Sequence, residues 1–374
     1  MVLLLGALAL ASSIVHPAGR HGQVQTLYQS PPHHTISAFA EDRGVLAWFE
    51  PNPHKCNIVW VLQGVVRDSL PAQGGSYRNV TCRWQVPAGS TVGLAVASGA
   101  TTVSALWSLR ESTTHSPLRF DYVLGATLSD RNERRFQEVA HGQRGAGLWL
   151  GELAGDDDTL VFAVAEVGFK DEVACLSTPT AAHACDMQTS GGGIYRVVGR
   201  RPPTLVKGTT AAVAVACSGT EIAYVRAAPA ATSTGRPLPS SSLPVDILDV
   251  RTGSLVTSVA TTGTPIAVAL SADVLALLER TADGLTLAWY DPASGNSLGS
   301  LQVPASATGL AAGKGVVAFS VERSIRVVGV STGHARLVAK TAGLPIGLSI
   351  DGTRVAWAEN AGDRGRIRAV DVIG

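Results

Sequence analysis

Short apolar runs, each preceded by a turn residue, recur along the chain and predict strands rather than helices. The clearest copy is Ser349 to Glu359, SIDGTRVAWAE, in which Asp-Gly makes a turn and Val355, Ala356 and Trp357 begin a strand. Equivalent runs place a large residue at the position of Trp357 in five further copies: Trp48, Phe162, Tyr224, Leu277 and Phe319. The first interval is about twice as long as the others, which predicts one more copy in TTVSALWSL, around Val103 to Trp107.

Each copy belongs to a larger unit. An Ala- and Val-rich strand precedes it, as in AAVAVAC and PIAVALS, and a hairpin with a Thr-Gly or Ser-Gly turn follows it, as in VDILDVRTGSLVTSV. Seven such units predict an all-β fold: a seven-bladed β-propeller of four-stranded antiparallel blades. The last unit lacks a fourth strand, and Gln23 to Gln29 could supply it. We therefore expect the amino-terminal strand to pair with the last blade and close the ring.

These repeats resemble those of known families. The S-x-D-G-T-R-V-A-W pattern of Ser349 to Trp357 resembles the blade motif of TolB-like and related WD-repeat-like propellers, bacterial and secreted. The D-V-R-T-G hairpin at Asp249 to Gly253 is similar to YVTN- or quinoprotein-type repeats. The resemblance implies a propeller over nearly the whole mature chain, and the TolB likeness implies docking of a partner. The tryptophans that follow the Thr-Gly turn in quinoprotein dehydrogenases are absent, so we expect no quinone or other cofactor.

Composition supports a single large domain of short strands. The 374 residues include 40 Gly and 19 Pro, and 45% are hydrophobic while 16% are charged. The 30 Lys and Arg residues are nearly balanced by 29 Asp and Glu residues, so the chain has no general electrostatic attraction to nucleic acid or to anionic membranes. We assign residues 23–374 to the propeller and expect a monomer.

The amino terminus predicts export. Met1 to Ala11, MVLLLGALALA, is an apolar run that ends in a small-x-small cleavage pattern, although no Lys or Arg precedes it. A membrane-spanning helix needs about 20 apolar residues, and His16 and Arg20 come too early for that. Residues 1–22 are therefore expected to be a signal peptide and short leader. The mature protein would be secreted, periplasmic or on the cell surface, with no membrane span.

The cysteines suit an oxidising compartment, where disulfides persist. Cys56 and Cys82 lie on two strands that could form one hairpin, and Cys175 and Cys185 bracket a loop, so these two pairings are favoured. Cys217 is left over and is expected to be a buried, unreactive thiol.

Polar clusters do not form a recognisable active site. Asp156 to Asp158 could hold calcium, but a solvated turn explains the run better. Ser190 to Gly193 lies in a segment expected to be flexible and lacks the context of a nucleophile elbow or phosphate loop. A mixed-charge cluster is expected in a loop between blades: Arg131, Glu133, Arg134, Arg135 and Glu138.

Histidines do not show metal-ligand spacing either. No C-x2-C or H-x3-H pair occurs among the candidates, which are His33, His34, His54, Cys56, His115, His141 and His183. We therefore assign no catalytic, cofactor-binding or metal-binding residues. Asn79 begins a glycosylation sequon, which matters only where the source glycosylates that signal.

Two long insertions, Phe169 to Gly193 and Ala227 to Pro244, are the places where binding is expected, since long loops on rigid scaffolds commonly bind partners. The hypothesis is a non-catalytic scaffold that binds a protein or small ligand at a propeller face. The alternative is a propeller enzyme, a lyase, glycosidase or quinone-dependent dehydrogenase, with its site in the central funnel. Few acidic residues are expected on the innermost strands, which favours the scaffold.

Overall fold

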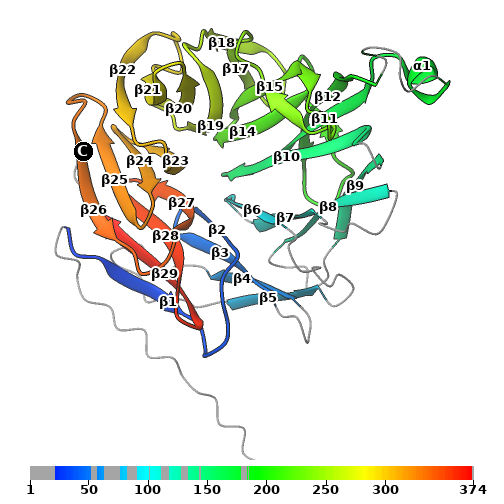
Figure 1. The fold of residues 1–374 in the computed structure, drawn as a ribbon. Helices are drawn as coiled ribbons and strands as arrows, with labels where there is room; N and C mark the ends of the chain where they lie inside the picture. The colour runs from blue at the N-terminus through cyan, green and yellow to red at the C-terminus, as the bar shows by residue number, and fades with distance from the viewer. Residues whose placement is uncertain are drawn as a thin grey trace, which may run out of the picture.

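The chain folds into a ring of antiparallel sheets around a central space (Figure 1). The computed structural model describes residues 22–51, 57–62, 76–81, 91–100, 102–110, 118–127, 134–142, 145–177, 183 and 185–372. Within these ranges the regular elements are strands, apart from one six-residue helix, α1 (Glu172–Ser177). No helix in them is long and apolar enough to cross a membrane.

Four sheets have four strands each. The first contains β2 (Ala38–Asp42), β3 (Val45–Glu50), β4 (Asn57–Leu62) and β5 (Ser76–Thr81). The second contains β19 (Thr264–Leu270), β20 (Leu275–Thr281), β21 (Gly284–Tyr290) and β22 (Ser297–Val303). The third contains β23 (Ala307–Gly313), β24 (Val316–Val321), β25 (Ser324–Gly329) and β26 (Ala335–Lys340). The fourth contains β27 (Ile346–Asp351), β28 (Arg354–Ala361), β29 (Arg364–Asp371) and, beside β29, β1 (Gln25–Gln29).

The remaining strands form one thirteen-stranded sheet, which corrects the expectation of seven separate four-stranded blades. Its first strands are β6 (Thr91–Ser98), β7 (Val103–Arg110), β8 (Leu118–Thr127), β9 (Arg134–Gly142), β10 (Gly147–Asp156) and β11 (Thr159–Phe169). It continues with β12 (Met187–Val197), β13 (Thr204–Leu205), β14 (Ala212–Ser218), β15 (Glu221–Ala231), β16 (Pro237–Pro239), β17 (Val245–Asp249) and β18 (Leu255–Val259).

Two single-residue pairings join this sheet into one. Gly147 of β10 pairs with His141 of β9, and Gln188 of β12 pairs with Ala230 of β15. The second pairing arises because β12 and β15 are eleven residues long, so their outer parts meet. These outer parts belong to the two insertions, which the structure shows to be partly strands rather than loops.

The strands begin and end where the repeat pattern predicts, because glycine-containing turns separate the apolar runs. In the clearest copy, β27 ends at Asp351, Gly352 adopts a φ of 61°, and β28 begins at Arg354. Gly can take this left-handed conformation without a Cβ clash. The further copy expected near residue 105 is confirmed: it forms β7, with Trp107 fully buried.

The core consists of apolar layers between the faces of neighbouring sheets. Trp357 of β28 is 0% exposed and packs in a cluster with Val327 of β25 and Ala339 of β26. On the opposite face of β28, Ala356 and Ala358 pack with residues of β2 and β3. Both faces of the second strand of a sheet are therefore buried, which explains why these strands are continuous apolar runs.

Buried glutamates hold the loops that lead into the innermost strands. Glu279 accepts hydrogen bonds from the backbone amides of Thr262 (2.9 Å) and Gly263 (3.0 Å), and Glu359 accepts one from Ala342 (3.0 Å). Both glutamates are 0% exposed. Each lies two residues after the large residue of its copy, so the loop that leads into a sheet is fixed by a side chain from the second strand of that same sheet.

The amino-terminal strand pairs antiparallel with β29, from Gln25 opposite Ala369 to Gln29 opposite Arg366. Tyr28 also packs on Trp48 of β3, with ring centroids 4.3 Å apart, and its hydroxyl donates to Glu50. β1 is therefore held both by backbone pairing and by side-chain contacts with a second sheet.

Other predictions meet mixed outcomes. The disulfide between Cys175 and Cys185 is confirmed, and Cys217 is a free cysteine. Cys56, Cys82 and the expected signal peptide lie outside the described residues, although β4 and β5 do form the expected hairpin. Three members of the mixed-charge cluster, Arg134, Arg135 and Glu138, lie in β9 and not in a loop, because Arg134 to Gly142 pairs with β8, while Arg131 and Glu133 lie outside the described residues.

Trp357→Ala should lower the free energy of unfolding by about 3 to 5 kcal/mol, because it removes a fully buried ring and leaves a cavity between two sheets. Chemical denaturation measures this. Leu337→Ala on β26, where the side chain is 47% exposed, is the control and should cost less than about 1 kcal/mol. An equally small effect of Trp357→Ala would contradict the packing described above.

Candidate functional site

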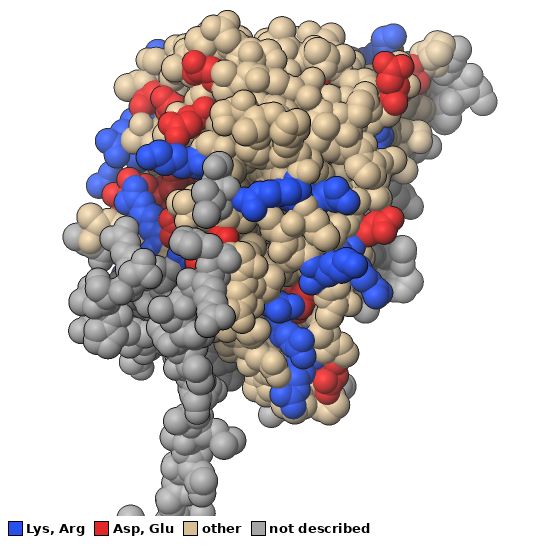
Figure 2. All heavy atoms as spheres, turned by 90° about the vertical axis from the view of Figure 1, so that its left-hand side faces the viewer, with Lys and Arg blue, Asp and Glu red and all other residues tan. Residues whose placement is uncertain are grey.

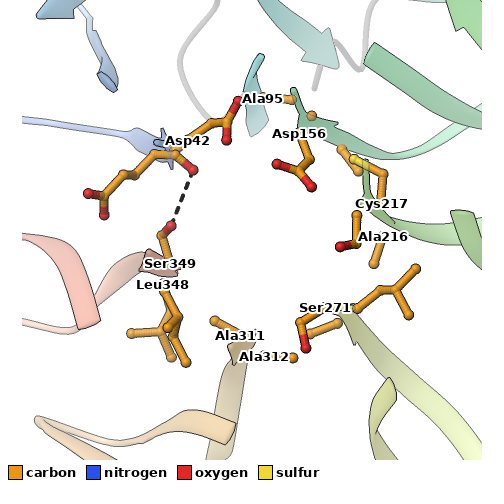
Figure 3. A pocket seen from close by; sticks show the side chains of 18 of the residues that line it. Asp42, Ala95, Asp156, Ala216, Cys217, Ser271, Ala311, Ala312, Leu348 and Ser349 are labelled. Atoms are coloured by element: carbon orange, nitrogen blue, oxygen red, sulfur yellow. Dashed lines mark hydrogen bonds between the residues drawn. The ribbon is translucent and has the colours of Figure 1, made fainter. Parts of the chain in front are cut away.

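One end of the central channel forms a cavity of about 450 Å³. Its wall is made by the last residues of the innermost strands and the turns that follow them: β2, β6, β10, β14, β19, β23 and β27. Figure 3 shows side chains from these strands facing one another across the opening. A second cavity, about 540 Å³, follows earlier parts of several of the same strands and shares Leu94, Leu153 and Leu348 with the first.

Two carboxyl groups from different strands meet at this mouth. Asp42 at the end of β2 and Asp156 at the end of β10 face each other (Figure 3). Their side chains are hydrogen-bonded. Oδ2 of Asp42 accepts hydrogen bonds from the backbone amides of Ser98 (2.5 Å) and Asp157 (3.0 Å). Oδ2 of Asp156 accepts one from the amide of Gly219 (2.5 Å). The pair therefore connects β2 with the turns after β6, β10 and β14.

Burial raises the pKa of Asp42, the nearby charge and hydrogen bond of Asp156 add to the rise, and the amides of Ser98 and Asp157 oppose it, so that the pKa lies at about 8. Asp42 thus holds a proton at neutral pH. Burial is the main cause that raises the pKa of the Cys217 thiol, and the charges of Asp156 and Asp42 raise it as well. The thiol therefore stays protonated and unreactive.

Glu41 lines the same mouth. Burial raises its pKa, Arg354 opposes the rise and Asp351 adds to it, so that the pKa lies at about 7. Neither of its carboxyl oxygens has a hydrogen-bond partner among the described residues. Asp42, Glu41, Asp156 and Asp351 together correct the expectation that the innermost strands bring few acidic residues to the channel.

The chemistry available at the mouth is limited. The protonated carboxyl of Asp42, beside the carboxyl of Asp156, could act as a proton donor. The hydroxyl of Ser349, however, donates to the carbonyl of Glu41 (3.2 Å), and that of Ser271 to the carbonyl of Val274 (3.4 Å), so neither is paired with a base. Among the described residues, no group of three or more His, Cys, Asp or Glu could hold a metal ion.

The aspartates considered from the sequence separate by role. Asp157 and Asp158 form the expected turn, and Asp157 pairs with Arg43 (2.9 Å). Asp156 is the exception to the solvated-turn prediction, because its carboxyl faces the channel. Ser190 to Gly193 is part of a regular strand: it lies in β12, where Gly192 pairs with Ala165 of β11.

The candidate histidines whose side chains the structure describes do not form one cluster. His34 contacts Glu50 (3.1 Å), His33 contacts Asp363 (3.1 Å), and His183 contacts Asp186 (2.9 Å) in the disulfide-bonded segment. His54, Cys56, His115 and the side chain of His141 lie outside the described residues. The sequence did carry a signal for the mouth, because Glu41-Asp42 and Asp156 each precede the turn of a repeat, but their convergence depends on ring geometry.

Comparison with known proteins identifies the fold. No family model matches the chain, and no curated protein is significantly similar to it. Solved structures do match. The β-propeller domain of the Trilobed protease from Pyrococcus furiosus has a TM-score of 0.51 at 11% identity, over 90% of this chain and 95% of that one.

Pyrococcus horikoshii acylaminoacyl peptidase gives a TM-score of 0.52 at 9% identity, over 87% of this chain and 49% of that one. BamB from Moraxella catarrhalis gives a TM-score of 0.43 at 10% identity, over 92% of this chain and 97% of that one. At these identities the likeness concerns the fold alone. The chain therefore has the β-propeller fold.

Asp42→Asn should flatten the pH dependence of stability. The pKa of Asp42 is raised in the fold, so the folded state holds a proton that the unfolded chain releases. The contribution of Asp42 to folding stability is fully present below its pKa in the unfolded chain. It is lost as the pH rises through about 8, its pKa in the folded protein. Between pH 5 and 8, the free energy of unfolding of the Asp42→Asn variant should therefore fall less steeply with pH than that of the unmodified protein. The difference should be up to about 1.4 kcal/mol per pH unit.

Denaturant unfolding at a series of pH values measures this slope. Asp273→Asn, at an exposed turn, is the matched control and should leave the slope unchanged. Identical slopes for Asp42→Asn and the unmodified protein would contradict a protonated Asp42.

Proposed function

We propose that this chain is a secreted or cell-envelope scaffold, a monomer that binds another protein without catalysis. The observation that carries the proposal is a projecting structure on the rim, here called the hairpin arm: residues 167–177, 185–189 and 227–239. The arm contains the outer parts of β11, β12 and β15, with β16 and α1. In Figure 1, α1 lies well outside the ring.

The hairpin arm is rigidly built. Phe169 pairs with Met187, and the Gln188–Ala230 pairing joins the two hairpins side by side. The Asp171 side chain accepts a hydrogen bond from the amide of Ala174 (2.9 Å), which caps the start of α1. The disulfide of Cys175, whose side chain is buried, fixes the other end of the segment to Cys185.

The tip of the arm exposes two apolar side chains. Val173 and Leu176 are 78% and 71% exposed, and their i, i+3 spacing places them on one face of α1. Because the arm is already ordered, a partner that covers this face would lose little conformational entropy from it. This combination of exposed apolar surface and rigid support favours protein binding.

The channel favours the scaffold over the enzyme alternative. The carboxyl pair and the raised pKa of Glu41 suit a lyase or glycosidase, yet Asp42 and Glu41 are only 6% and 9% exposed. Both members of the pair accept backbone amide hydrogen bonds and connect parts of the ring. The disulfide supports an oxidising compartment, in keeping with the apolar run at the amino terminus.

We further propose that the ring has seven blades, with β1 closing it. The thirteen-stranded sheet divides into three successive units, each beginning with an innermost strand: β6 to β9, β10 to β13, and β14, β15, β17 and β18. Together with the four separate sheets they make seven. The pairing of β1 with β29 supports closure by the amino-terminal strand.

Removal of residues 1–29 should markedly lower the midpoint of thermal unfolding, because it exposes the edge of β29 and removes Tyr28 from Trp48. Removal of residues 1–22, which leaves β1 whole, is the control. Equal midpoints for the two truncations would argue against closure by β1.

Val173→Asp with Leu176→Asp should abolish partner capture while leaving the unfolding midpoint within about 1 °C, since both side chains are exposed. A photo-crosslinker placed at position 172 and exposed to the cell-envelope fraction measures capture. Leu298→Asp, at a 44% exposed position on β22, is the control. Failure to recover a defined adduct, or an adduct that survives the double substitution, would count against the arm as the binding site.

A further inference from the structure

A row of arginines lies along β29. Arg364, Arg366 and Arg368 are alternate residues, so they project from one face of the strand about 7 Å apart. In register they stand opposite Ala361, Glu359 and Trp357 of β28. Trp357 packs against the β25 and β26 side chains Val327 and Ala339, so the row lies on the face of its sheet that looks toward β23–β26.

Two arginines of the neighbouring sheet extend this row. The carbonyl of Arg323 accepts a hydrogen bond from Thr341, and the next residue, Ala342, donates to Glu359, which is paired with Arg366. Arg336 of β26 is paired with Val327, which lies in the same cluster as Trp357. We call these five residues the arginine patch: Arg323, Arg336, Arg364, Arg366 and Arg368.

Basic side chains are frequent on this side of the molecule. Figure 2 shows several Lys and Arg side chains, with Asp and Glu among them, on the side of the ring where β25, β26 and β1 lie. Residues 307–340 alone have a formal charge of +4, while the whole chain has +1. The contributors are Lys314, Arg323, Arg326, Arg336 and Lys340, against Glu322.

The guanidinium groups of the row have unused donors. Elsewhere, Arg43 pairs with Asp157 and Arg226 with Asp246. In the row, Arg368 contacts Glu359 at 3.4 Å, whereas Arg364 and Arg366 are half-buried and form no ion pair with an Asp or Glu among the described residues. Donors of this kind, at the spacing of a strand, suit carboxylates on alternate residues of an extended chain.

An apolar contact lies beside these charges. Leu344, in the loop that Ala342 anchors to Glu359, is 68% exposed. We propose that the arginine patch binds an acidic peptide segment of a protein partner in extended conformation, with carboxylates at alternate positions and an apolar side chain against Leu344. The inference rests on the binding role proposed above and adds the chemistry of one partner surface.

The test uses the full chain and a fluorescein-labelled peptide of alternating Glu and Leu, with fluorescence anisotropy as the measurement. Arg364→Gln with Arg366→Gln should weaken binding about tenfold or more, because two charge-assisted contacts are lost. Arg201→Gln with Arg280→Gln, an equal charge change at exposed positions elsewhere, should leave binding within about twofold. Leu344→Ser should weaken it by a smaller factor.

Several outcomes would overturn the proposal. They are absence of peptide binding, equal binding of a peptide with Gln in place of Glu, and equal losses in the two double variants. Tighter, Arg366-dependent binding of phosphatidylserine vesicles or of oligothymidine would assign the patch to a membrane or to nucleic acid instead. Crosslinking from the hairpin arm is measured in the same variants. If it persists while peptide binding is absent, the patch fails and the scaffold role stands.

Discussion

Face-to-face packing of neighbouring sheets is the interaction on which the rest of this structure depends. Every described residue of β3 is buried, and Trp357 and Phe162 are completely enclosed between sheets. A sheet that buries both faces leaves its second strand no polar position to offer to solvent. Function must therefore reside at strand ends, on outer strands, or on additions to the ring.

The same packing explains where the buried carboxyls lie. Glu279 and Glu359 come directly after the enclosed part of a strand, where a loop turns inward and its amides need acceptors. Asp42 and Asp156 do the equivalent at the channel mouth. Acidic residues in this ring thus serve first to connect neighbouring parts of the structure, and their proximity to a cavity is a consequence of that geometry.

The hairpin arm and the arginine patch are the features that packing does not require. Val173 and Leu176 bury nothing in the ring, and Arg364 and Arg366 neutralise no carboxylate among the described residues. One surface is apolar and the other basic, so they would recognise different chemistry. A scaffold that holds two such surfaces in a fixed relation could contact a partner at more than one point.

The sequence by itself determined the strand periodicity, the turns and the large residue of each repeat, because alternation and Asp-Gly or Thr-Gly turns are local properties. It also indicated the Cys175–Cys185 disulfide and the strand that pairs with β29. Only the tertiary structure decided that Asp42 meets Asp156, since their ring positions bring together residues more than a hundred positions apart. The thirteen-stranded sheet could not be predicted from local sequence patterns either, because it depends on the pairing of two long hairpins at Gln188 and Ala230.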